Sequence, residues 1–168
     1  MDDQDESAAK PQRTLFTSRR EYVEGFDKVV SLARRELRIF DPDLMDLGLD
    51  SRERIAALET FLRGGRLHKL YIALHDPDQL VRRLPRVMNM LTQFSANILI
   101  YKTGSEAARA EDCFVLADSS HVVRRAVAKQ PRGVLLLDDN AEGRLMLDRF
   151  REIWDRSTPS VSATTSGL

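Results

Sequence analysis

The sequence has few of the features that mark a disulfide-stabilised, secreted or membrane-spanning protein. Cys113 is its single cysteine, so no disulfide can form within the chain and a reducing compartment is expected. No apolar run approaches the roughly 18 residues that a membrane span requires. The first residues, MDDQDESAAKPQR, are acidic and polar, unlike a signal peptide. These absences predict a cytoplasmic protein that does not contact a membrane.

The sequence also has no excess of charge of one sign. Lys plus Arg and Asp plus Glu are both 26, so the formal net charge is zero, which gives no overall attraction to nucleic acid. Aromatic residues make up only 7% of the chain, and stacked bases need such platforms. One run, Arg124 to Arg132, is basic, and a solvated edge explains it. Nucleic acid is not the expected partner; a nucleic-acid-binding accessory protein with a local basic face stays as the second alternative.

The composition that is present fits one globular domain. A chain of 168 residues with 42% hydrophobic residues is long enough for a sizeable core. Residues 14–157 carry the apolar periodicity and form the expected domain. Residues 1–13 and 158–168 are small, polar or charged without such a period, and both are predicted to be disordered tails.

Apolar spacing and capping residues predict four helical segments. The first is expected to begin near residue 18, and the other three to cover about 51–63, 78–95 and 139–154. Ser18 with Glu21, and Asp50 with Glu53, have the spacing of cap partners. Pro85 lies inside the third segment, which predicts a kink or two abutting helices there.

Short apolar runs between these helices predict strands. They cover 37–40, 67–74, 97–101 and 133–137, with a hairpin at 111–125 that turns around Ser119 and Ser120. Helices and strands alternate in the first part of the chain, which is typical of parallel pairing. The predicted fold is therefore α/β: a mixed, mainly parallel sheet with helices on both faces and an antiparallel hairpin.

Polar residues follow three of the predicted strands and suggest a site. Asp41, His75 with Asp76, and Lys102 each come at or just after a strand end. The carboxyl ends of parallel neighbours lie at one side of a sheet, where ligands usually bind. Such groups could serve acid–base chemistry or hold a phosphate. The alternative is that the Asp-Pro dipeptides are strand-ending turns in which aspartate caps the next element.

Other kinds of site are not supported by the sequence. His68 and His75 point to opposite faces of one strand, so together they cannot ligate one metal. Gly64-Gly65 precedes a strand rather than a helix, the reverse of a phosphate loop. Ser119 and Ser120 have no G-x-S-x-G context. We expect no metal and no cofactor.

The hairpin places two more polar residues on either side of its turn. Asp118 and His121 could pair across that turn. An aspartate at this position also commonly binds the backbone of its own turn. The spacing alone leaves both interpretations open.

Several segments together resemble one half of a phospholipase D-like domain. They are RELRIFDPDL, HKLYIALHDPDQL, NILIY, CFVLADSSHVVRR and RFREIWDRS, and the likeness covers about 18–157. In that superfamily a His-x-Lys-x4-Asp motif lies on a strand that turns into the next, and a helix ending in Phe-x3-Trp closes the unit. Phe150 and Trp154 have that spacing. The sequence is also similar to an uncharacterised proteobacterial domain that in some proteins follows an acetyltransferase domain.

The resemblance implies a missing catalytic motif. If Asp118 occupies the aspartate position, Glu111 stands at the histidine and Cys113 at the lysine. The family's histidine is the nucleophile that forms a phospho-enzyme, and its lysine binds phosphate; glutamate and a neutral thiol cannot replace them. The resemblance therefore implies a catalytically degenerate member, a pseudoenzyme.

The leading functional prediction is a non-enzymatic module for ligand binding or protein interaction. Active sites of the resembled family are made from two facing halves, which implies a homodimer with the strand ends near the interface. The partner could be a phosphate-bearing small ligand held by Lys102, His75 and Arg124, or a protein such as an acyltransferase. The alternative is a phosphodiester or acyl hydrolase that uses non-standard residues. The candidate ligand-binding residues are Asp41, His75, Asp76, Lys102, Glu111, Asp118, His121 and Arg124.

Overall fold

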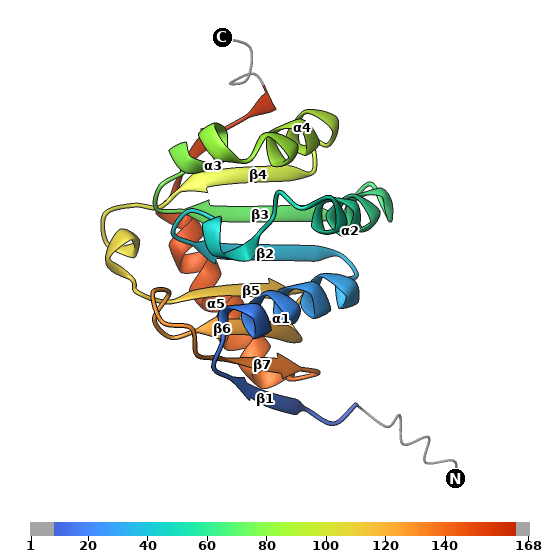
Figure 1. The fold of residues 1–168 in the computed structure, drawn as a ribbon, viewed down its shortest axis with the longest axis vertical. Helices are drawn as coiled ribbons and strands as arrows, with labels where there is room; N and C mark the ends of the chain where they lie inside the picture. The colour runs from blue at the N-terminus through green and yellow to red at the C-terminus, as the bar shows by residue number, and fades with distance from the viewer. Residues whose placement is uncertain (1–8, 164–168) are drawn as a thin grey trace.

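The structure, a computed structural model, describes residues 9–163 and is built around one mixed sheet of eight strands (Figure 1). Across the sheet the strand order is β1-β7-β6-β5-β2-β3-β4-β8. The strands are β1 (Gln12–Phe16), β2 (Glu36–Asp41), β3 (Lys69–Leu74), β4 (Ile98–Lys102), β5 (Cys113–Ala117), β6 (His121–Arg125), β7 (Gly133–Leu137) and β8 (Thr158–Val161).

Helices cover both faces of the sheet, as the sequence predicts. The first face carries α1 (Arg19–Leu32), α2 (Arg52–Arg63), α3 (Asp78–Arg83) and α4 (Pro85–Gln93), and α5 (Asn140–Asp155) crosses the second face behind it (Figure 1). The alternation of side chains along each strand divides the core accordingly. In β2, for example, Leu37 and Ile39 pack under the first set of helices, whereas Phe40 packs with Phe150 of α5.

Local signals set the helix ends. The Ser18 side chain accepts the Glu21 N–H and caps α1. At α2 the predicted cap is wrong by one residue: Ser51, not Asp50, is the N-cap. The Asp50 carboxylate instead accepts the N–H of Arg86, next to Pro85 at the start of α4. The break at Pro85 separates α3 from α4, because its ring cannot continue a helix.

The sheet is mixed, but its parallel part is smaller than expected. Only the β2–β3 and β3–β4 pairs are parallel among the paired strands of residues 9–163. The hairpin β5–β6 leads into β7, and each of these strands is antiparallel to its neighbours. A short turn can join two strands only in antiparallel fashion, so this half of the sheet lacks crossover helices.

Two strands lie partly or wholly in segments for which the sequence predicts disorder. β1 includes residues 12 and 13 and pairs with β7, and β8 lies entirely within 158–168 and pairs with β4. Both are edge strands, so the main chain of each is hydrogen-bonded to one neighbouring strand and most of their side chains are exposed. Phe16 of β1 and Val161 of β8 are the buried residues. The ordered sheet therefore extends past both ends of the predicted domain. Residues 1–8 and 164–168 of the predicted tails lie outside the described part.

The strand directions define two opposite rims of the sheet. We call the side where β2, β3 and β4 end the carboxyl rim; β5 begins and β6 ends there (left in Figure 1). The opposite side, where β2 begins and the β5–β6 hairpin turns, is the amino rim. Between the rims lie the buried strands of the core.

Candidate functional site

The structure divides the predicted site residues between the two rims. The carboxyl rim carries six of them: Asp41, His75, Asp76, Lys102, Glu111 and Arg124. Asp118 and His121 lie at the amino rim, because β5 runs antiparallel to β2. A single site made from all eight residues is therefore excluded by the strand directions.

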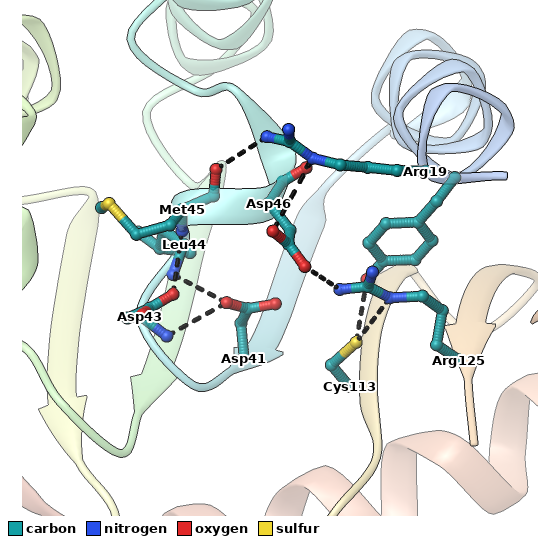
Figure 2. Close-up of polar contacts among 9 residues, drawn as sticks. Arg19, Asp41, Asp43, Leu44, Met45, Asp46, Cys113 and Arg125 are labelled. Atoms are coloured by element: carbon teal, nitrogen blue, oxygen red, sulfur yellow. Dashed lines mark hydrogen bonds and ion pairs between the residues drawn. The ribbon is translucent and has the colours of Figure 1, made fainter. Parts of the chain in front are cut away.

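Asp41 is buried beneath the turn that follows β2 (Figure 2). Its Oδ2 accepts the N–H groups of Asp43 at 3.1 Å and Leu44 at 2.7 Å. Leu44 has a φ of 72°, and these bonds help to hold that left-handed residue. Oδ1 is buried without a hydrogen-bond partner among the described atoms. Burial raises the pKa of Asp41 to about 6.

Cys113 is enclosed next to Asp41 by Tyr22 and Arg125. Its Sγ lies 3.4 Å from the Tyr22 hydroxyl and 3.4 Å from Arg125 Nε, and the guanidinium lies 4.2 Å from the centre of the Tyr22 ring. Arg125 also donates to the Asp46 carboxylate at 3.0 Å (Figure 2). Burial raises the pKa of the Cys113 thiol and of the Tyr22 hydroxyl. A shielded thiol of this kind is a poor nucleophile.

Asparagine in place of Asp41 is expected to stabilise the protein at pH 7.5 by about 2 kcal/mol. The unfolded carboxyl titrates near 4 and the folded one near 6. As the pH rises through this window, the unfolded state loses its proton first, so the wild type loses stability. The asparagine amide would keep one acceptor oxygen for the Leu44 N–H.

Urea unfolding of wild type and Asp41→Asn between pH 4 and pH 7.5 measures this difference. The gap should close toward pH 4. Asp76→Asn is the matched control, since that carboxylate is exposed on the same rim. A variant that is less stable than wild type at pH 7.5 would show that the charge of Asp41 contributes favourably to the fold.

His75 borders a partly enclosed cavity of about 290 Å³ on the carboxyl rim. Its Nδ1 lies 2.7 Å from Thr103 Oγ1, and its ring meets Phe40 edge-on at 5.3 Å. Burial lowers the pKa of the imidazole, against smaller opposite effects of the Ala110 backbone and the Asp112 carboxylate. His75 and Glu111 are the two predicted residues that line this cavity. The neutral ring is part of its wall.

Charged and apolar groups complete the wall. Arg109 and Lys129 line the cavity with Glu111, and apolar surface comes from Pro42, Ala108, Ala110, Val127 and Ala128. Neither Arg109 nor Lys129 has an ion pair within residues 9–163. The cavity therefore offers two cationic groups, one carboxylate and an apolar interior.

Arg124 is engaged on the second face of the sheet. Its Nη2 donates to Oδ2 of the buried Asp112 carboxylate at 3.3 Å. Arg149 of α5 donates two further hydrogen bonds, of 3.1 and 2.5 Å, to the same carboxylate. The sequence did not indicate Asp112 and Arg149 as partners, because no local pattern relates residues that far apart in the chain. Arg125 of the same basic run is 2% exposed, so the solvated-edge interpretation is wrong for Arg124 and Arg125, whereas Lys129 and Arg132 are exposed.

Asp76 and Lys102 do not converge with His75. The Asp76 carboxylate accepts the N–H of Asp78 at the start of α3, which matches the capping alternative. Lys102 is exposed at the end of β4 and lies outside the cavity wall. Lys102, His75 and Arg124 therefore do not face one common ligand position.

At the amino rim, Asp118 neither pairs with His121 nor closes its own turn. Its carboxylate accepts the backbone N–H groups of Arg34, Arg35 and Glu36 at 2.9 to 3.0 Å. His121 Nδ1 instead accepts the N–H of Asp138 at 3.1 Å. Asp118 thus fixes the connection between α1 and β2.

Two further properties concern the described part of the chain as a whole. Within residues 9–163 no three His, Cys, Asp or Glu side chains are grouped so that they could ligate a metal ion. In the same range no helix combines the length and apolar character of a membrane span.

Solved structures with the same fold include a phospholipase D family member and an archaeal chromatin protein. Nuc of Salmonella typhimurium, a phospholipase D family member, is 14% identical over 91% of this chain and 100% of its own (TM-score 0.60). NucT of Helicobacter pylori is 13% identical over 90% and 100% (TM-score 0.62). TrmBL2, an archaeal chromatin protein whose structure shows a novel mode of DNA binding, is 14% identical over 89% of this chain and 54% of its own (TM-score 0.65).

These likenesses establish a phospholipase D-like fold, as the sequence segments predict. This chain spans about half of TrmBL2, so the remainder of that protein has no counterpart in the comparison. A comparison with curated protein sequences finds no match. The model of a domain of unknown function, DUF7931, matches residues 18–163. The chain belongs to the DUF7931 family.

Proposed function

We propose that this chain is a binding module on a phospholipase D-like fold, and that its ligand is a small organic acid held in the cavity beside His75. The observation that supports this most is the cavity itself. It lies beyond the carboxyl ends of parallel strands, where α/β proteins commonly bind ligands. Its wall combines apolar surface with Arg109 and Lys129.

The surroundings of Cys113 and Glu111 support a role without hydrolysis. If the aspartate of the resembled motif is placed on Asp118, the position of the nucleophilic histidine falls on Glu111. The position of the phosphate-binding lysine then falls on Cys113. Glu111 is exposed, and a carboxylate does not form the phospho-enzyme of that chemistry. Cys113 is fully buried against Tyr22 and Arg125. Asp41, the carboxylate with the raised pKa, lies outside the cavity wall.

The charge of the wall selects the ligand class. Arg109 and Lys129 outnumber Glu111, and the lowered pKa of His75 keeps that ring neutral near pH 7. A carboxylate can bind the two cations while an apolar body contacts Pro42, Val127 and Ala128. A ligand without charge would leave both cations unpaired.

Titration of the ¹⁵N-labelled protein with benzoate tests the proposal. The backbone signals of residues 108–111 and 127–129 should shift together, and Lys129→Glu should weaken binding about tenfold or more, because it reverses the charge at the wall. Lys102→Glu makes the same change on the same rim outside the cavity and should leave binding within about twofold. Equal weakening by both variants would refute a site in this cavity.

Hydrolysis is tested separately with bis-(p-nitrophenyl) phosphate. We expect release of p-nitrophenol no faster than in buffer alone. Turnover that persists through repeated purification would favour the hydrolase alternative. Turnover that falls in Glu111→Gln would place that carboxylate in the reaction.

Self-association and an acyltransferase partner remain predictions from the resemblance. Light scattering across a dilution series tests the first. A stable dimer mass would support two facing carboxyl rims, and a monomer at all concentrations would contradict it.

A further inference from the structure

A second cavity, of about 440 Å³, lies at the amino rim. It opens between the α1–β2 connection, the β5–β6 turn and the start of α5. It is separated from the His75 cavity by the length of the strands. Binding of an organic acid beside His75 does not involve it, and the groups on its wall are of a different kind.

Two neighbouring arginines present their guanidinium groups at this cavity. Arg34 and Arg35 are both exposed and line it. Neither side chain makes an ion pair or hydrogen bond within residues 9–163, whereas their backbone N–H groups are held by Asp118 at 2.9 Å. The carboxylate therefore fixes the main chain of both arginines. Its two oxygens are engaged by backbone donors, so its charge is largely compensated.

His121 adds an oriented donor. Its side chain is 12% exposed, and Nδ1 accepts the N–H of Asp138 at 3.1 Å. A nitrogen that accepts this bond cannot carry the ring proton, so in the neutral ring the proton is on Nε2. Nε2 lies 4.0 Å from the Asp138 carboxylate, beyond hydrogen-bond distance. This N–H remains available to a ligand.

Asn140 at the start of α5 adds amide donors. Ser120 Oγ donates to Asn140 Oδ1 at 2.8 Å, which leaves the Asn140 side-chain NH₂ without a partner among the described groups. The positive end of a helix of 16 residues lies at the same place. The wall also carries the partly exposed Asp138 carboxylate. Two guanidiniums and these donors outweigh that single charge.

We propose that the amino-rim cavity binds a phosphate monoester of a small molecule. Planar guanidinium groups bind phosphate oxygens in pairs, and an ester phosphate offers enough acceptor oxygens for the arginines, His121 Nε2 and the Asn140 amide. The ester-linked part can extend across the open side of the cavity. A carboxylate, with two oxygens, would leave several of these donors unpaired.

Titration with glycerol 3-phosphate in phosphate-free buffer tests this, with binding read from ¹⁵N backbone shifts. The signals of residues 34–35, 118–121 and 138–141 should move together. The double variant Arg34→Gln, Arg35→Gln should weaken binding about tenfold or more. It keeps both backbone N–H groups that hold Asp118, so the fold is expected to survive, and circular dichroism checks this.

The matched control is Arg82→Gln with Arg83→Gln. These neighbouring arginines on α3 are also exposed and without ion pairs in the described chain, and their loss should leave binding within about twofold. If both double variants weakened binding equally, the loss of overall positive charge would explain the effect, and the proposal would be overturned. Shifts confined to the His75 cavity would also overturn it, and Lys129→Glu distinguishes that case. Glycerol alone should produce no shifts; if it matches the ester, phosphate is not recognised.

Discussion

Alanine at position 143 is expected to destabilise the protein by about 3 kcal/mol, although alanine favours helices over glycine by up to about 1 kcal/mol. Gly143 lies in the first turn of α5, where the helix packs against the β5–β6 turn. A Cβ built there would lie 1.8 Å from the Ser119 carbonyl oxygen and 2.9 Å from the Ser120 nitrogen. Both are backbone atoms, so no side-chain rotation can relieve the overlap.

Chemical denaturation of wild type and Gly143→Ala measures this loss. Arg144→Ala, at the next and exposed position of α5, is the control and should change stability by less than about 0.5 kcal/mol. A stabilised Gly143→Ala variant would show that α5 can move away from the turn without cost. It would also mean that the hydrogen bond from Asp139 N–H to the Ser120 carbonyl does not fix their separation.

Asp118→Ala is the second change with a large expected effect, a loss of about 3 kcal/mol. The carboxylate accepts three backbone N–H groups, and Asp118 itself has a φ of 55°. Alanine removes all three bonds and is also unfavourable in the left-handed region. The three donors of residues 34–36 would then have to find water or rearrange.

Asp118→Asn separates the two contributions. Asparagine tolerates positive φ and keeps one acceptor oxygen, so we expect about half of the alanine effect in urea unfolding. If asparagine were as harmful as alanine, the negative charge would be the essential property. If alanine cost less than about 1 kcal/mol, the three hydrogen bonds would not determine the conformation of the α1–β2 connection.

The sequence predicts the elements that depend on local signals. Ser18 and Pro85 act within one turn of their own position, so the start of α1 and the break before α4 follow from neighbouring residues. β8 shows the limit of this reasoning. Thr158 to Ser160 are exposed and carry no large apolar side chain, and they are ordered because β4 supplies main-chain partners. The residues of that segment do not themselves predict which strand will pair with it.

The candidate site shows the same division. Polar residues after strands predict a site at the carboxyl rim, and six of the eight predicted residues lie at that rim, since strand ends can be read from the sequence. The contacts that charged residues make in the fold cannot be read from the sequence in the same way. Arg125, for example, belongs to a basic run, and only the fold shows that it is buried between Cys113 and Asp46. Asp112 likewise meets Arg149 of α5 on the second face of the sheet, a contact between residues far apart in the sequence. Charge pairing of this kind depends on topology.

The lateral position of β1 has a consequence for how the chain acquires its structure. Leu15 of β1 pairs with Val134 of β7, and β2 pairs with β5 as well as with β3. During synthesis β1 lacks its strand partner until β7 has also been made. Closure of such long loops slows folding relative to a fold with sequence-local contacts. The β1–β7 pair thus joins two edge-side segments that lie far apart in the sequence.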